Sequence, residues 1–114
     1  RLVAVNGVAQ MKHMLVATDY RPSSPALKEA VMQGIQDEQV LVIDAGVTTT
    51  PLFYFALHMA KLDGGIMITA SHNPSQYNGL VITGPDAQVI GEDFGLLEIK
   101  KIAMEIEKWA DISF

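Results

Sequence analysis

Residues 69–79 are the stretch whose residue types point most directly to chemistry, and they read Thr-Ala-Ser-His-Asn-Pro-Ser-Gln-Tyr-Asn-Gly. Ser71 follows the apolar residues 65–68, and a loop dense in turn-forming residues comes after it. A hydroxyl exposed at a strand end, with the imidazole of His72 beside it, can accept and donate a chemical group. The plainer alternative is a serine that satisfies backbone groups of a tight turn. A serine-hydrolase elbow fits less well, because it needs Gly-x-Ser-x-Gly and a helix directly after the serine.

The neighbours of this serine and an earlier loop carry further candidate side chains. An imidazole can move a proton near neutral pH or donate a hydrogen bond to phosphate, so His72 is either functional or a structural group bonded within the loop. Asn73 is expected to hold the loop through side-chain to backbone hydrogen bonds. In loop 18–24, Asp19 and Arg21 form either a solvated surface ion pair or a site with the arginine aimed at phosphate or at loop backbone.

Apolar periodicity and helix start signals predict alternating helices and strands. The expected elements are a helix at 1–12, a strand at 14–17, a helix at 25–37, a strand at 40–43, a helix that begins at 48–51, strands at 65–69 and 80–83, and a helix at 93–109. Ser24 is expected to cap the second helix ahead of Pro25. The third helix is expected to carry an apolar stripe that includes Leu52, Phe55 and Met59.

Two further expectations concern burial and pairing. The β-branched run 40–43 is typical of a strand that is buried on both faces. Residues 89–90 are expected to pair briefly, and Leu96, Ile99 and Ala103 are expected to share one face of the last helix.

The alternation of strands and helices predicts one α/β domain over residues 1–114, a three-layer α/β/α fold with a mostly parallel four-stranded sheet. Loops 18–24, 46–50 and 70–79 each follow a strand at its carboxyl end, which is the edge where open α/β sheets bind ligands. Two of these loops lead into capped helix N-termini, which favour anions. The pattern therefore predicts an anion-handling edge without fixing a reaction.

The composition excludes several classes of protein. Of the 114 residues 49 % are apolar and 18 % charged, which argues against disorder. The net charge is −5, and no cluster of basic residues indicates binding to nucleic acid or to a membrane surface. No apolar run approaches the roughly 18–20 residues of a membrane span. The absence of cysteine excludes disulfides and thiolate metal sites, and it is compatible with the cytoplasm, the expected location.

Residues 69–74 together with Tyr77-Asn78-Gly79 closely resemble the phosphoserine loop of the α-D-phosphohexomutases, the phosphomannomutase/phosphoglucomutase family. Loop 17–24 resembles that family's Gly-Arg-Asp-x-Arg-x-Ser-Ser pattern, although Ala17-Thr18 replace its leading Gly-Arg. The resemblance implies that the serine carries the phosphoryl group and that its neighbours serve the site. It assigns catalysis to Ser71 and His72 and the substrate or phosphate loop to Thr69, Asn73, Arg21 and Asp19.

The resemblance also implies that the chain is the first of four domains around one cleft. The family transfers a phosphoryl group between the 1- and 6-positions of a hexose phosphate. Magnesium is held by an aspartate-rich loop of the second domain, with the serine phosphate as a further ligand. That loop and the other domains are not in this sequence, so we expect the isolated chain to be inactive. The surface that faces those domains would be apolar, which predicts weak self-association as a symmetric dimer.

Two departures from the family keep a second hypothesis open. The family's Tyr-Asp-x-Arg-Gly segment is not found here, which leaves open that the first strand of the domain is missing. Val81 stands where the family usually has a lysine, and a valine can neither pair with phosphate nor donate a proton. The chain is therefore either part of a working mutase or a non-catalytic module of this family that binds phosphosugars or a protein partner.

Overall fold

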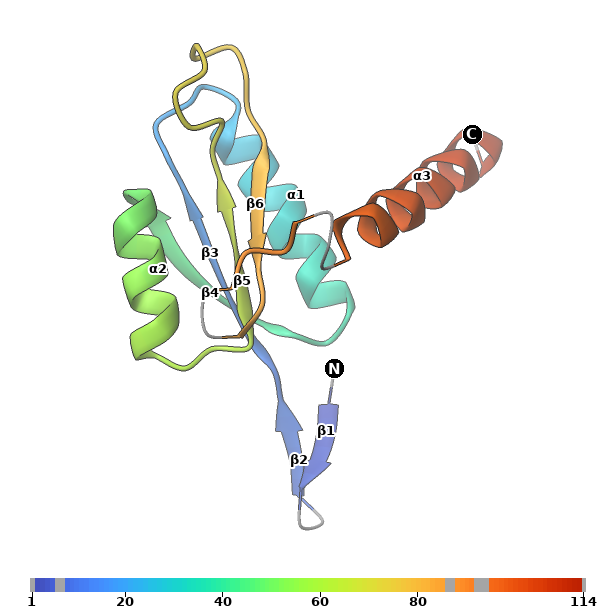
Figure 1. Cartoon of the computed structure of the whole chain (residues 1–114). Coiled ribbons are helices and arrows are strands. Elements are labelled where there is room, and N and C mark those ends of the chain that lie inside the picture. Colours follow the sequence, from blue (N-terminus) through green and yellow to red (C-terminus); the bar gives the residue numbers. More distant parts are fainter. Residues whose placement is uncertain (1, 6–7, 86–87, 92–94, 114) are drawn as a thin grey trace.

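A computed structural model of the chain describes residues 2–5, 8–85, 88–91 and 95–113. Figure 1 shows the elements in chain order. They are β1 (Leu2–Val5), β2 (Val8–Met11), β3 (His13–Thr18), α1 (Ser24–Asp37), β4 (Leu41–Val47), α2 (Thr50–Met59), β5 (Gly64–Ile68), β6 (Leu80–Thr83) and α3 (Leu96–Ser113).

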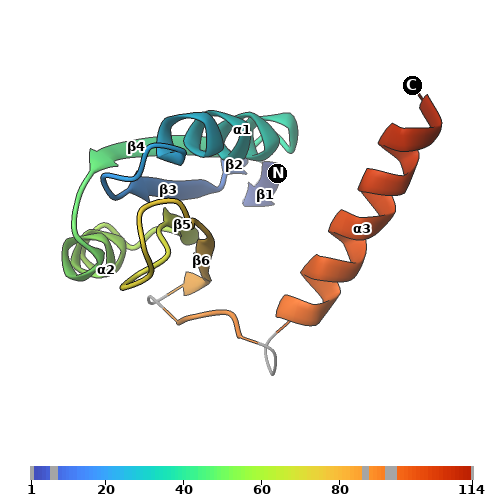
Figure 2. The ribbon, with the colours of Figure 1, turned by 90° about the horizontal axis from the view of Figure 1, so that it is seen from above.

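The central sheet has four strands in the order β4-β3-β5-β6. Strand β3 pairs in parallel with β4 and with β5, whereas β6 is antiparallel to β5. Figure 2 shows α1 on one face of this sheet and α2 on the other. Right-handed crossovers explain this arrangement, because α1 leads to one neighbour of β3 and α2 leads back across β3 to the other. The predicted three-layer fold and its mostly parallel sheet are confirmed.

The best-buried core lies between the sheet and α2. Its buried members come from β3, α2 and β5 and are Leu15, Ala17, Phe53, Leu57 and Met67. The apolar stripe predicted for α2 is therefore wrong: Leu52, Phe55 and Met59 are 58 %, 62 % and 63 % exposed. Helix α2 is apolar on several sides, so its periodicity alone could not show which side meets the sheet.

Strand β4 occupies an edge of the sheet, and the expectation that residues 40–43 are buried on both faces is wrong. Leu41 and Ile43 are exposed, as is Val47 at the end of the strand. A β-branched run identifies a strand, but its place within the sheet depends on which strands pair with it.

The predicted helix at 1–12 is also wrong, because β1 and β2 form an antiparallel hairpin there. Three of the eight residues in the two strands are valines, and β-branched residues favour the extended backbone over a helix. The Asn-Gly dipeptide between the strands is a frequent hairpin sequence. The helix prediction gave more weight to the helical spacing of apolar residues than to this turn signal. Residues 6–7 themselves lie outside the described part of the chain.

The C-terminal part follows the predicted order. Val89 pairs with Thr83 in an isolated bridge, and the N–H of Ile90 donates to the carbonyl of Ile82 at 2.8 Å, so the predicted pairing is confirmed. The last helix, α3, begins at Leu96, and the predicted start at residue 93 lies outside the described residues. Figure 1 shows α3 directed away from the sheet, and Leu96, Ile99 and Ala103, predicted to share one face of this helix, are exposed.

Within the described residues, no helix combines the length and apolarity that crossing a membrane requires.

Close packing at Gly65 gives a stability prediction with an internal control. A Cβ at this position would lie 2.8 Å from Phe53 Cζ and 3.0 Å from the Leu15 carbonyl oxygen, so Gly65→Ala should lower the free energy of unfolding by about 1–3 kcal/mol. Gly34 lies in α1 with no atom within 4 Å of such a Cβ, so Gly34→Ala should raise it by about 0.5–1 kcal/mol. Urea denaturation followed by circular dichroism measures both. Equal effects of the two variants would contradict this account of the core.

Candidate active site

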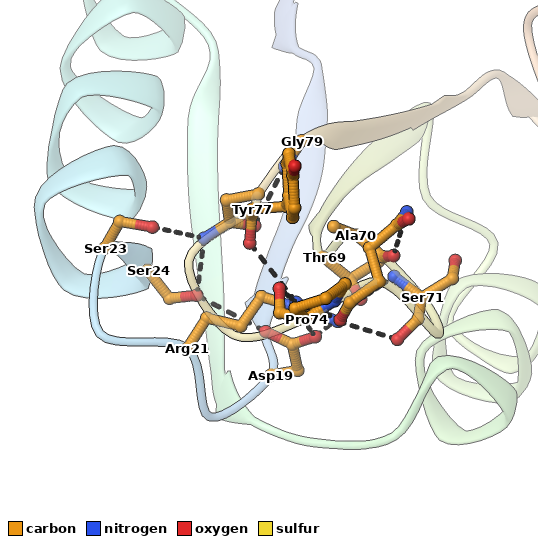
Figure 3. Close-up of polar contacts among 12 residues, drawn as sticks. Asp19, Arg21, Ser23, Ser24, Thr69, Ala70, Ser71, Pro74, Tyr77 and Gly79 are labelled. Carbon is orange, nitrogen blue, oxygen red and sulfur yellow. Dashed lines mark hydrogen bonds and ion pairs between the residues drawn. The ribbon is translucent and has the colours of Figure 1, made fainter.

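The candidate site lies at the carboxyl ends of β3 and β5. These strands are parallel neighbours, so the loops that follow them emerge at the same edge of the sheet. The N–H of Asp19, just after β3, donates to the carbonyl of Ile68 at the end of β5 at 3.2 Å. Figure 3 shows Asp19 and Arg21 beside the loop that begins at Thr69. The loop containing Ser71, residues 69–79, is called the serine loop below.

Ser71 combines an exposed side chain with a backbone conformation that is rare for serine. Its φ of 55° is left-handed, which costs a residue with a Cβ about 1–3 kcal/mol unless neighbouring contacts compensate. The Ser71 N–H donates to Thr69 Oγ1 at 2.9 Å. Among the described residues no hydrogen bond to the Ser71 hydroxyl is recorded, so this oxygen is open to a ligand.

Arg21 binds the backbone of the serine loop, which decides between the two functional roles predicted for it. Its Nη2 donates to the carbonyl of Ser71 at 2.6 Å. Its Nη1 lies 2.9, 2.8 and 3.2 Å from the carbonyl oxygens of Asn73, Pro74 and Tyr77. A guanidinium has five N–H donors, and these contacts use most of them. Arg21 is therefore a clamp on the loop rather than a free phosphate ligand.

Asp19 anchors this clamp through an ion pair. Its Oδ2 accepts from Arg21 Nε at 2.9 Å. The side chains of Asp19 and Arg21 are only 26 % and 9 % exposed, which favours the second of the two alternatives over a solvated surface pair. The same oxygen accepts from Thr69 Oγ1 at 2.5 Å, and Oδ1 lies 3.4 Å from the Ser24 hydroxyl. Burial alone would raise the pKa of Asp19, but the hydrogen bonds from Thr69 and Arg21, with the charge of Arg21, lower it from its ordinary value of 3.8.

A second tie joins the end of the serine loop to the start of α1. Asn78 Nδ2 donates to the hydroxyls of Ser23 and Ser24 at 2.9 and 3.0 Å. Ser24 is buried within α1, and Ser23 occupies the N-cap position without a side-chain cap, so the predicted capping role of Ser24 is wrong. The sequence predicts only a turn-forming role for Asn78, because no local pattern indicates a partner 54 residues away.

An open pocket of about 1170 Å³ lies beside Ser71. His72 also lines it, and across from the serine loop its wall includes the residues Thr48–Thr50 at the start of α2. Thr49 caps that helix by accepting from the N–H of Leu52 at 3.3 Å, so loop 46–50 leads into a capped helix N-terminus, as predicted. Asn73 Nδ2 donates to the carbonyl of Ala70 at 2.8 Å, which confirms the loop-holding role predicted for it.

The described residues do not fit a complete magnesium site. Nowhere in the described part of the chain do three or more His, Cys, Asp or Glu side chains cluster where they could hold a metal ion. Asp19, the one carboxylate among the described residues of the pocket wall, already accepts hydrogen bonds from Arg21 and Thr69.

Val81 lies on the α2 side of β6, half-buried against the core. It is the partner of Met67 in the β5–β6 pairing, and Met67 lines the pocket. A longer side chain at position 81 would thus extend beside a residue of the pocket wall.

Comparison with known proteins identifies similar sequences over most of the chain. Residues 3–110 match the family described as "Phosphoglucomutase/phosphomannomutase, alpha/beta/alpha domain I". A phosphomannomutase of Vibrio cholerae is 44 % identical over 96 residues, which is 84 % of this chain and 21 % of the relative. A phosphomannomutase of Salmonella typhimurium is 41 % identical over 92 residues, 81 % of this chain and 20 % of the relative. A protein of Xanthomonas campestris named "Phosphohexose mutases" is 38 % identical over 102 residues, 88 % of this chain and 23 % of the relative. The chain thus spans only about a fifth of the length of these relatives.

The lowered pKa of Asp19 predicts how the stability of the site depends on pH. A carboxylate with a depressed folded-state pKa stabilises the fold above its unfolded value, and this contribution is lost as the pH falls through the folded value. The free energy of unfolding should therefore fall as the pH drops below 3.8, and Asp19→Asn should show a smaller fall than the unaltered chain. Urea denaturation at a series of acidic pH values measures this difference.

Asp44 provides the control, because its pKa is lowered independently by hydrogen bonds from Lys28 and from the Gly46 N–H. Asp44→Asn should remove a separate part of the pH dependence, and the two effects should add. An acid dependence that is unchanged in Asp19→Asn would contradict the role given to this ion pair.

Proposed function

Because the chain belongs to the phosphoglucomutase/phosphomannomutase family, as its domain I, we propose that Ser71 is the residue that carries a phosphoryl group to and from a hexose phosphate. One observation supports this most strongly. Ser71 is exposed and lines a pocket, while its backbone is held by contacts from Thr69 and Arg21. A nucleophile held in this way meets its substrate without reorganising.

The proposed reaction has two balanced transfers. In the first, a sugar hydroxyl attacks the phosphorus of phosphorylated Ser71, the bond from phosphorus to Oγ breaks, and the proton of the attacking hydroxyl ends on Oγ. The sugar is then a bisphosphate. In the second, Ser71 Oγ attacks the other phosphate of that sugar, and the bond from that phosphorus to its sugar oxygen breaks. The proton of the Ser71 hydroxyl ends on that sugar oxygen, so the serine is phosphorylated again and the sugar keeps one phosphate.

His72 is the candidate proton carrier for these steps. It stands next to Ser71 in the chain and lines the same pocket, and an imidazole can take up and return a proton near neutral pH. Thr69 and Asn73 shape the loop around the serine, as their hydrogen bonds to the Ser71 N–H and the Ala70 carbonyl indicate.

The rest of the mutase machinery would lie outside the described part of this chain. Magnesium would take its carboxylate ligands from there. The described residues on the pocket wall include no lysine or arginine, and transfer of a phosphoryl group needs such cationic groups. We therefore propose that the remaining domains of a longer protein are its partners and that the chain alone does not turn over substrate. The proposed substrate is a hexose phosphate, and the proposed location is the cytoplasm.

A chimera tests the assignment of the phosphoryl acceptor. In it, this chain replaces the segment that it matches in the Vibrio cholerae phosphomannomutase. After incubation with a hexose 1,6-bisphosphate, peptide mapping should locate phosphate on Ser71. Ser71→Ala should abolish the labelling and leave the fold intact, because Ser71 is exposed.

Ser75→Ala is the matched control, since Ser75 is an exposed serine of the same loop, and it should keep the label. The isolated chain, treated in the same way, should remain unlabelled. Phosphate on Ser75, or a folded chimera without phosphate, would contradict the proposal. The second of these outcomes would favour a non-catalytic module that binds phosphosugars or a protein.

The position of Val81 gives an independent prediction. A lysine there would extend beside Met67 on the pocket wall and bring a positive charge to the phosphoryl group. Val81→Lys should speed phosphate incorporation in the chimera by about 10-fold or more, since one well-placed donor is worth that much in phosphoryl transfer. Val81→Met supplies length without charge and should leave the rate near its starting value. Equal rates for both variants would contradict the hypothesis that a positive charge at position 81 assists the transfer.

A further inference from the structure

The contacts around Ser71 close into a ring. Thr69 Oγ1 accepts from the Ser71 N–H at 2.9 Å and donates to Asp19 Oδ2 at 2.5 Å. On the other side of the serine, Arg21 Nη2 donates to the Ser71 carbonyl at 2.6 Å, and Arg21 Nε donates to the same Asp19 oxygen at 2.9 Å. Both peptide groups of one residue are thus held, and both holds converge on a single carboxylate oxygen. This set of four residues is called the Ser71 ring, and Figure 3 shows it.

We propose that the Ser71 ring is a positioning device for the reaction, in which Asp19, Arg21 and Thr69 keep the acceptor serine in its left-handed conformation. This inference rests on the proposed function of Ser71. The positioning residues act on the backbone of the serine: Arg21 and Thr69 hold the peptide groups of Ser71, and Asp19 holds Arg21 and Thr69.

The need for such a device follows from the backbone of Ser71. A φ of 55° is unfavourable for a residue with a Cβ, so an unrestrained loop would leave this conformation. Fixing only the N–H or only the carbonyl would leave the other peptide group free to rotate. The ring restrains both, and the ion pair inside it is largely shielded from water, which strengthens the charge-assisted bonds.

The ring predicts that a change at Arg21 affects the hydrogen bond of the Ser71 N–H. Arg21 does not contact this N–H, but removing its guanidinium should weaken the hydrogen bond through Asp19 and Thr69. Arg21→Lys keeps the charge but cannot span the carbonyls that the guanidinium reaches. Thr69→Val keeps the shape and removes both hydrogen bonds of the hydroxyl, whereas Thr69→Ser keeps the hydroxyl.

The first test measures amide hydrogen exchange by NMR in the 114-residue chain, so it does not depend on the proposed function. In Arg21→Lys and in Thr69→Val the Ser71 N–H should exchange about 10-fold faster or more, while core amides such as that of Val16 in β3 change much less. Thr69→Ser should stay within about twofold of the unaltered chain. So should the control Ser23→Ala, which removes a hydroxyl outside the ring. An unchanged exchange rate of the Ser71 N–H in Arg21→Lys, or an equal increase at Val16, would contradict the proposal that the ring restrains Ser71.

The second test measures phosphate incorporation at Ser71 in the chimera. Thr69→Val should lower the maximal rate about 10- to 100-fold and leave the half-saturating concentration of the bisphosphate within about twofold, because misplacement of the acceptor affects the transition state more than binding. Thr69→Ser should restore the rate. An unchanged rate in a Thr69→Val variant with faster Ser71 exchange would overturn the link to the reaction. Absence of label in the unaltered chimera would contradict the proposed function. Whether the ring holds the backbone of Ser71 is tested separately, by the exchange rates alone.

Discussion

The ion pair between Asp19 and Arg21 is the interaction on which the geometry of the site depends. It sits just beyond β3, and from there Arg21 reaches the carbonyl oxygens of four residues of the serine loop. Loops of this length have many accessible conformations, and closing one into a fixed shape costs conformational entropy. Several hydrogen bonds to one rigid, planar cation offset that cost, because the guanidinium is held by Asp19 on its other side.

The sheet makes this ion pair effective, because the parallel pairing of β3 and β5 brings Asp19 next to Thr69. The pairing in turn depends on a tight core on the α2 side. Gly65 lets the ring of Phe53 approach the strand, and Leu57 and Met67 complete the same cluster. The core and the site are therefore parts of one construction, in which the buried face of α2 fixes the strands whose ends carry the polar residues.

The carboxyl edge of the sheet and the outer side of α2 differ in what they expose. The carboxyl edge carries a polar network that ties the serine loop to α1 and leaves the Ser71 hydroxyl open. On the outer side of α2, Leu52, Phe55 and Met59 form an apolar surface of a kind that monomeric proteins rarely leave uncovered. The chain spans about a fifth of the length of its relatives, and the proposal of further domains gives this surface a reason to be apolar.

The sequence by itself determined the serine loop, most strands and the fold class, because these depend on local signals. Residues 65–83 contain an apolar strand, a run of turn formers and a second strand, and the structure follows that order. The role of Asn73 was also local, since its partner Ala70 is three residues away. The position of Ser71 as the exposed hydroxyl follows from the same short range of the chain.

Only the tertiary structure decided what Arg21 binds, which face of α2 is buried and where β4 lies. The contacts of Arg21 span 50 to 56 residues, and they exist only because two strands far apart in sequence are neighbours. The buried face of α2 and the exposure of β4 depend on the strand order, which periodicity does not contain. Local patterns state what a segment can form, whereas its partners are set by how all segments pack together, and the Ser71 ring belongs to that second kind of information.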